Sequence, residues 1–369
     1  MRKPLYTLLV FGALFASCSE DDDSPMVNEL EVPQTYTFQS FNASGSSGEA
    51  ITDDLAELAG YMKTGRPGDA GDPDRNQTLN SQSLLEIYTN NGNTPSLSAV
   101  TTSEYDALVR DWFSEIAAAS GNTYGEGAEG GTYGGYLVDE NAVELEQFIE
   151  KGLYGAALYN QAVTVHLNTN NTTEGLGATE TSVLEQNWDN AFLLYGADAS
   201  FPNNGNDSWA AKYAARRDNA GFYTNLKTAF LTGRAAITAG EEFTDERNRA
   251  VVDIRENWEK ALAATAINYL YSAKNGLLNA TDDAGTASAY HAWAEAYAFM
   301  YGFRGVDSDF RIISDVEVNN VLGYLKSSPA LFTQDNIGDI DSAIDAIAQV
   351  YNFQDPTIFE INDVSANNR

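Results

Sequence analysis

The chain has 369 residues and a formal net charge of −32, with 53 Asp and Glu against 21 Lys and Arg. Such acidity excludes a nucleic-acid binder, because phosphates would be repelled, and it opposes peripheral binding to anionic lipid. The single cysteine excludes an internal disulfide, a cysteine-ligated zinc site and a catalytic thiol. The length suffices for one large domain or two closely packed ones.

The amino terminus has the features of a secretory signal peptide. Arg2 and Lys3 precede an apolar run, residues 5–16, which is too short to span a bilayer. Cys18 follows at the position where a lipoprotein signal is cleaved and acylated, although Phe15 stands where such sites usually carry leucine. We therefore expect Cys18 to carry lipid. A plain secretory signal and an uncleaved anchor are the alternatives.

An acidic segment follows the cysteine. Residues 19–23, Ser-Glu-Asp-Asp-Asp, resemble the signal that some Gram-negative bacteria use to export lipoproteins to the outer face of the outer membrane. A solvated spacer is the alternative interpretation. We predict a signal peptide over residues 1–17, a lipidated acidic tether over 18–50 and a helical body over 51–369. The expected location is the outer membrane, with the body exposed at the cell surface.

Beyond residue 50 the hydrophobic pattern is typical of helices. Apolar residues recur at three- and four-residue steps in three stripes: Tyr105, Leu108, Trp112, Ile116 and Ala119; Val251, Ile254, Trp258, Leu262, Thr265 and Tyr269; Ile337, Ile340, Ile344, Ile347 and Tyr351. Capping boxes, which satisfy free amides at a helix start, are predicted at Thr101/Glu104, Ser182/Glu185 and Ser314/Glu317. Strong period-two alternation is nearly absent. The sequence predicts an all-α body, a multi-helix bundle.

One glycine-rich stretch, residues 121–135, interrupts this helical pattern. It contains seven glycines together with Tyr124 and Tyr133, so its backbone has great freedom. Long loops in compact domains often cover a functional site. A plain connection between two helices is the alternative.

The chain has only two histidines, His166 and His291. On a helix His291 and Glu295 lie one turn apart on one face. A neutral imidazole and a carboxylate placed in this way can share a metal ion, and facing helices of a bundle can supply further carboxylates. The alternative is that Glu295 only hydrogen-bonds His291 inside a packed core.

His166 ends a helix predicted over residues 144–166. Gly152 and Gly155 lie inside this helix, where each glycine costs about 1 kcal/mol relative to alanine. Such a cost needs a structural reason. We expect another helix to pack closely against the flat surface that the two glycines provide.

Two carboxylates of the same helix, Glu146 and Glu150, are candidate additional ligands if they face His291 and Glu295. Exposed ion pairs with Lys151 are the alternative interpretation. The sequence contains no zinc-protease, nucleophile-elbow, P-loop or dinucleotide-binding motif. We therefore assign no catalytic residue and favour a protein that is not an enzyme.

Four segments carry a resemblance to known proteins. They are residues 150–161 (EKGLYGAALYNQ), 187–192 (NWDNAF), 232–237 (TGRAAI) and 291–299 (HAWAEAYAF). They resemble landmarks of an uncharacterised family of bacterial lipoproteins, and the resemblance extends over most of residues 35–365. That family is distantly similar to the imelysins, which are iron-regulated helical proteins.

Imelysins have a two-bundle helical fold and a Gly-x-His-x-x-Glu motif, and they have been classed as metallopeptidases and as iron-uptake proteins. The motif corresponds here to His291 and Glu295. This chain has Ala289 at the glycine position, and its glutamate comes at the fourth step after the histidine instead of the third. The resemblance implies two packed four-helix bundles and a metal site at these two residues.

We therefore expect a non-enzymatic, outer-membrane-anchored lipoprotein that helps to acquire iron, haem or another metal nutrient. It would bind iron or another divalent metal at His291 and Glu295, or dock on an outer-membrane uptake receptor. The lipid on Cys18 would provide the contact with the membrane, and nucleic acid is not an expected partner. A metal-dependent peptidase and a structural surface-interaction module are the alternatives.

Overall fold

The computed structural model describes residues 29–38, 46–68, 74–90, 92–125, 130–168, 178–201 and 204–362. The predicted signal peptide and Cys18 lie outside these ranges. From the predicted tether, residues 29–38 form a segment without regular secondary structure, which we call the strap. None of the helices in the described ranges is long and apolar enough to cross a membrane.

Twelve α-helices run through the described ranges. They are α1 (Ser47–Thr64), α2 (Ser81–Asn90), α3 (Leu97–Val100), α4 (Ser103–Ala119), α5 (Leu145–Leu153), α6 (Ala178–Tyr195), α7 (Trp209–Ala215), α8 (Phe222–Ala239), α9 (Thr244–Asn279), α10 (Asp283–Tyr301), α11 (Asp315–Leu325) and α12 (Asp339–Tyr351). Two π-helical segments, η1 (Tyr154–Tyr159) and η2 (Ala162–His166), continue α5. Strands β1 (Gly130–Tyr133) and β2 (Tyr136–Asp139) form an antiparallel hairpin. The predicted all-α, multi-helix fold is confirmed.

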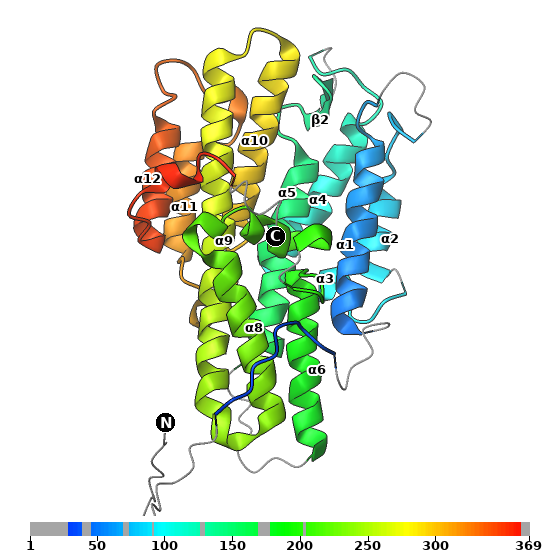
Figure 1. Ribbon diagram of the computed structural model, residues 1–369. Helices are drawn as coiled ribbons and strands as arrows, with labels where there is room; N and C mark the ends of the chain where they lie inside the picture. The colour runs from blue at the N-terminus through cyan, green and yellow to red at the C-terminus, as the bar shows by residue number, and fades with distance from the viewer. Residues whose placement is uncertain are drawn as a thin grey trace, which may run out of the picture.

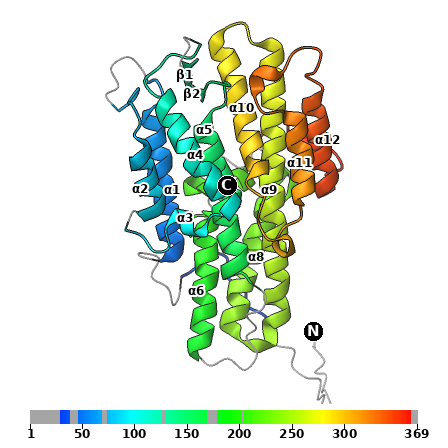
Figure 2. The same cartoon turned by 180° about the vertical axis from the view of Figure 1, so that it is seen from behind.

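Helix α9 is the long axis of the body (Figure 1). Its 36 residues rise about 54 Å at 1.5 Å per residue. Helix α8 packs along its first half and α10 along its second half. Helices α11 and α12 cover one side of the α9–α10 pair, while α1, α2 and α4 lie on the other side, around α5 (Figures 1 and 2). The division of this body into two imelysin-like bundles remains a prediction.

The apolar stripes predicted on α9 and α12 line one continuous core, whereas on α4 Val109 and Phe113 are buried in place of the predicted Leu108 and Trp112. On α9 the buried members of the predicted stripe are Val251, Ile254, Trp258, Leu262 and Thr265. On α12 they are Ile340, Ile344, Ile347 and Tyr351. Periodicity alone therefore identified which face of these helices is buried, because apolar side chains leave water wherever a helix packs on its neighbours.

The capping predictions met with mixed success. The box formed by Ser314 and Glu317 is present at the start of α11. The box at Thr101 is wrong, because the Thr101 hydroxyl donates to a carbonyl oxygen of the preceding turn and α4 begins one residue later than predicted. The box at Ser182 is wrong because α6 already begins at Ala178.

The glycines inside α5 and its continuation pack closely, as predicted. A Cβ atom added to Gly155 would lie 2.7 Å from the carbonyl carbon of Gly302, at the end of α10. The regular helix predicted up to His166 is wrong, however, because the backbone widens into π-helical segments after Leu153. Every residue from 145 to 159 is buried, in the regular helix and in the first π-helical segment alike, because neighbouring elements surround this part of the chain.

The glycine-rich stretch ends in a hairpin that rests on α10. Gly134 and Gly135 form its two-residue turn, and both have positive φ angles, 54° and 104°. A Cβ atom on Gly134 would lie 2.5 Å from the Cβ atom of Ala287 on α10. The expected loop is thus partly a strand pair, since glycine permits both the tight turn and the close contact.

Candidate functional site

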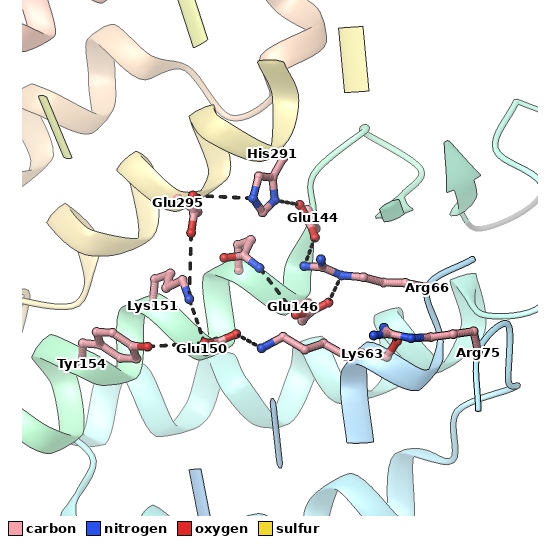
Figure 3. Close-up of polar contacts among 11 residues, drawn as sticks. Lys63, Arg66, Arg75, Glu144, Glu146, Glu150, Lys151, Tyr154, His291 and Glu295 are labelled. Carbon is pink, nitrogen blue, oxygen red and sulfur yellow. Dashed lines mark hydrogen bonds and ion pairs between the residues drawn. The ribbon is translucent and has the colours of Figure 1, made fainter. Parts of the chain in front are cut away.

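The side chains considered as metal ligands meet in one place in the interior. There α1 with the turn after it, α5 with the residue before it, and α10 contribute eight ionisable side chains, which we call the ion cluster (Figure 3). The ion cluster consists of Lys63, Arg66, Glu144, Glu146, Glu150, Lys151, His291 and Glu295.

Helix α5 and the residue before it supply half of the ion cluster. Glu144 is the residue before the helix, and Glu146 and Glu150 follow one turn apart on one face. Every residue of α5 is buried, and Glu146 is fully so. The exposed ion pairs considered for Glu146 and Glu150 are therefore not what these residues form. Buried carboxylates need cations beside them, because desolvation of an unpaired charge is costly.

Arg66 is the cation at one end of the ion cluster. Its Nη2 atom lies 2.5 Å from Oε1 of Glu144, and its Nε atom donates to Oε2 of Glu146. Gln147 lies between the two ends, and the amide orientation that satisfies both of its polar atoms lets its oxygen accept from Arg66 Nη2 at 2.8 Å and its nitrogen donate to Glu295 at 3.2 Å. The guanidinium group of Arg66 thus joins the turn after α1 to Glu144, which precedes α5, and to Glu146, which lies inside it.

His291 bonds mainly to Glu144 rather than to Glu295. Its Nδ1 atom lies 2.6 Å from Oε2 of Glu144, whereas its Nε2 atom lies 3.5 Å from Oε2 of Glu295. Tyr136 of β2 stacks on the imidazole ring, with ring centroids 4.6 Å apart. The hairpin that ends the glycine-rich stretch therefore covers the histidine. The i, i+4 spacing correctly predicted that His291 and Glu295 lie together. The closer partner of His291, however, is Glu144, which precedes α5.

Lys151 and Lys63 are the cations at the other end. Lys151 Nζ lies 2.7 Å from Oε1 of Glu150 and 3.9 Å from Oε1 of Glu295. Lys63 Nζ lies 3.0 Å from the second oxygen of Glu150. The hydroxyl of Tyr154 also donates to Glu150, at 3.3 Å. Figure 3 shows that these contacts join the two ends into one network.

Charge is balanced in the ion cluster only when it holds one extra proton. Four glutamates face three permanent cations, Lys63, Arg66 and Lys151, so the fourth positive charge must come from His291 or from protonation of a carboxylate. Burial disfavours a charged imidazole, but the hydrogen bond and the charge of Glu144 raise the pKa of His291 above its ordinary value. The geometry therefore favours a protonated His291.

Burial and neighbouring charges separate the pKa values of two glutamates on one helix. Burial, only partly offset by Arg66, raises the pKa of Glu146 to about 7. Burial acts on Glu150 too, but Lys151 and Lys63 outweigh it and lower the pKa of that carboxyl to about 2. Glu150 is thus ionised at neutral pH, and Glu146 is a second place for the shared proton.

The ion cluster is not a preformed metal site. In the described ranges no group of three or more His, Cys, Asp or Glu side chains is placed to hold a metal ion. Arg66 bridges Glu144 and Glu146, and a lysine holds Glu150, so these carboxylate oxygens already have cationic partners. The residues present do not fit a metal ion in this arrangement. Metal binding at His291 and Glu295 stays a prediction.

The second histidine has no part in this cluster. His166 is buried at the end of η2, where its ring nitrogens contact Asn187 at 3.1 Å and Gln161 at 3.4 Å. Burial lowers its pKa below the ordinary value. Its neighbours are neutral amides, so we interpret it as a packed core histidine.

Sequence reasoning missed Lys63 and Arg66. Lys63 lies in the last turn of α1 and Arg66 two residues after its end. The buried face of this helix includes Leu55, Leu58 and Met62. Two cations spaced three residues apart at the end of such a helix were a possible signal for buried acidic partners. Nothing in the sequence, however, indicated which of many carboxylates they would meet.

The ion cluster makes stability depend on pH near neutrality. Both Glu146 and His291 have raised pKa values, so each contributes stability that is fully present below its unfolded pKa and lost as pH rises through its folded pKa. For Glu146 that window runs from about 4.5 to about 7, and for His291 it begins near 6.5. We expect the free energy of unfolding to fall across these windows, measured by urea titration at a series of pH values.

Glu146→Gln should flatten this dependence, because three carboxylates then face three permanent cations. Glu256→Gln is the matched control, since Glu256 is half exposed and its ion pair within the described ranges is with Lys260 in the same helix. Its curve should run parallel to that of the wild type. Equal slopes for Glu146→Gln and the wild type would contradict the assignment.

The fold and the site define a class: an all-α body built around a charge-balanced interior cluster. Residues 88–354 match the model of a family described as a domain of unknown function, DUF4856, and the chain belongs to this family. The matched region includes all four glutamates and His291, while Lys63 and Arg66 lie before it. Comparisons with curated proteins and with solved structures found no match.

Proposed function

We propose that this protein is a surface-exposed outer-membrane lipoprotein that helps to acquire iron, haem or another metal nutrient without catalysing a reaction. It acts by docking on an outer-membrane uptake receptor. The signal-like amino terminus, the cysteine at position 18 and the acidic run behind it support the location. The resemblance to iron-regulated helical proteins supports the nutrient.

One observation carries the docking mechanism over direct metal binding. The carboxylates most suited to a metal already have cationic partners in the same chain, and the histidine is already bonded to one of these carboxylates. Their role is then to hold α1, α5 and α10 together, and the surface of the body is left to make the functional contacts. A metal ion at His291 and Glu295 would compete with Lys151 for Glu295 and would share His291 with Glu144.

Metal analysis separates the two mechanisms. We expect the purified lipoprotein to contain no stoichiometric transition metal, and its melting temperature to be unchanged by Fe(II) or haem. One metal per chain that is lost in His291→Ala would instead establish the ligand-binding mechanism. Cleavage of a peptide library that is likewise lost in His291→Ala would favour the peptidase alternative.

Growth on limiting iron tests the role itself. Cells that lack the protein should grow more slowly than wild-type cells when iron or haem is scarce, and equally well when it is abundant. Equal growth in both media, with iron and haem each tested as the sole source, would reject the nutrient role.

Cys18→Ser should remove the protein from the outer membrane. Acyl chains contribute about 0.8 kcal/mol per buried methylene, so several chains hold a protein on a membrane and their loss abolishes the attachment. Membrane fractionation and incorporation of labelled palmitate measure the effect, with Ser19→Ala as the control. An unchanged outer-membrane fraction in Cys18→Ser would show that the attachment does not depend on this lipid.

A further inference from the structure

A cavity of about 500 Å³ lies between the strap and α8, lined by none of the ion cluster residues. The strap crosses the face of α8 near the end where α8 turns into α9 (Figure 1). Leu231 and Ala235 of α8 and Phe243 form an apolar floor, and the strap forms the opposite wall. This groove is distinct from the site described above.

Tyr36 fixes the strap against the body. Its ring stacks on Phe192 of α6 with ring centroids 3.7 Å apart, and its hydroxyl donates to Asp189 at 2.6 Å. Only 4 % of Tyr36 is exposed. The wall of the groove is therefore held by a buried aromatic contact and a charge-assisted hydrogen bond, which are strong enough to keep its shape.

Arg234 lies at the base of the groove and is fixed there by two acidic side chains. Its Nε atom donates to Asp189 at 3.0 Å and its Nη1 atom to Glu185 at 2.8 Å, so the guanidinium group is held in place. Arg234 lines the cavity and is 5 % exposed, and its Nη2 atom has no hydrogen-bond partner among the described residues. Because that atom is itself buried, Arg234 is a fixed part of the groove wall whose charge Asp189 and Glu185 offset.

The charges around the groove select the chemistry of a partner. Two acids already neutralise Arg234, and Glu29 and Glu31 stand exposed in the strap. A carboxylate or phosphate would be repelled, while an uncharged carbonyl oxygen would not. Positive groups are favoured at the rim, because the whole chain carries a net charge of −32.

The strap itself indicates an extended partner. Glu29, Leu30, Glu31 and Val32 alternate acidic and apolar residues. In an extended chain successive side chains point to opposite sides, so a partner that alternates basic and apolar residues would match both the rim and the floor. We propose that the groove between the strap and α8 docks an extended basic segment of a partner protein, whose apolar side chains meet the floor and whose cations meet Glu29 and Glu31. This inference rests on the proposed docking role and names the chemistry of the partner.

Fluorescence anisotropy with the purified full-length lipoprotein tests this proposal. The probe is a labelled peptide, acetyl-Lys-Val-Lys-Val-Lys-amide. Ala235→Trp fills the groove from a half-buried position, and Glu29→Gln/Glu31→Gln removes the rim charge. Each change should weaken binding of the probe about tenfold, as expected when a groove or two facing charges are lost.

Charge on the remote α11–α12 side supplies the control. Asp335→Asn/Asp345→Asn removes the same charge from exposed positions there and should change affinity less than about twofold. Equal binding to Ala235→Trp and wild type, or equal weakening by the control pair, would overturn the proposal. Equal competition by acetyl-lysine amide would assign the groove to a small cation and would also overturn it.

Failure of this inference is distinguishable from failure of the nutrient role. Probe binding that responds as expected, in a strain whose growth on scarce iron does not depend on the protein, supports the groove and rejects the nutrient role. Growth that depends on the protein but is unaffected by Ala235→Trp, together with absent probe binding, rejects the groove alone.

Discussion

Arg66→Met is expected to lower the free energy of unfolding by about 3–5 kcal/mol, the usual cost of removing one partner from a buried ion pair. The Glu144 and Glu146 side chains are each only 1 % exposed, and both bond to this guanidinium. Without it two carboxylates remain in the interior beside one histidine. Urea unfolding followed by circular dichroism measures the loss.

Two further variants define the cause of that loss. Arg249→Met removes an arginine that is 70 % exposed and pairs with Glu246 on the same helix, so its effect should stay within about 0.5 kcal/mol. Adding Glu146→Gln to Arg66→Met should recover part of the stability, because one uncompensated charge disappears. A cost for Arg66→Met no larger than that of Arg249→Met would contradict the role given to the ion cluster.

Gly302→Ala is the second substitution with a large expected effect. A Cβ atom on Gly302 would lie 2.3 Å from the carbonyl oxygen of Gly152, a backbone atom that cannot turn aside. Gly152 cannot retreat, because its own missing Cβ position is filled by the hydroxyl of Tyr105. Overpacking of a rigid contact costs about 1–3 kcal/mol, and α10 must move away from α5 to relieve it.

Gly323→Ala is the matched control for this change. Gly323 lies inside α11 with nothing within 4 Å of its added Cβ atom, so alanine there should be neutral or stabilising by up to about 1 kcal/mol. Thermal unfolding compares the two variants. Because α10 carries His291, Gly302→Ala should also weaken the pH dependence described for the ion cluster. Equal melting temperatures for Gly302→Ala and wild type would refute the close contact.

The residues of α5 could be interpreted only in part from their own sequence. The glycines of α5 correctly indicated a close helix contact, since their cost in a helix demands a reason. The glutamates beside them were correctly singled out, but the exposed-pair alternative was wrong for them. Solvent exposure depends on what packs around a helix, and α5 is surrounded on all sides.

The same limit applies to His291. Spacing on α10 identified Glu295 as a neighbour, because helix geometry places i and i+4 side chains on one face. The shorter contact, 2.6 Å to Glu144, joins residues 147 positions apart. Contacts between distant segments leave no periodic signal in the sequence.

By itself the sequence determined the all-α class, the buried stripes of α9 and α12, and the expectation of a lipid anchor at Cys18. These are local properties, which depend on helical periodicity and on a short linear motif. Only the tertiary structure decided that Arg66 and Lys63 neutralise the acids of α5, and that the strap and α8 enclose a groove. Which charges pair in an interior depends on how the helices pack, because a carboxylate removed from water accepts whichever cation the fold brings within reach.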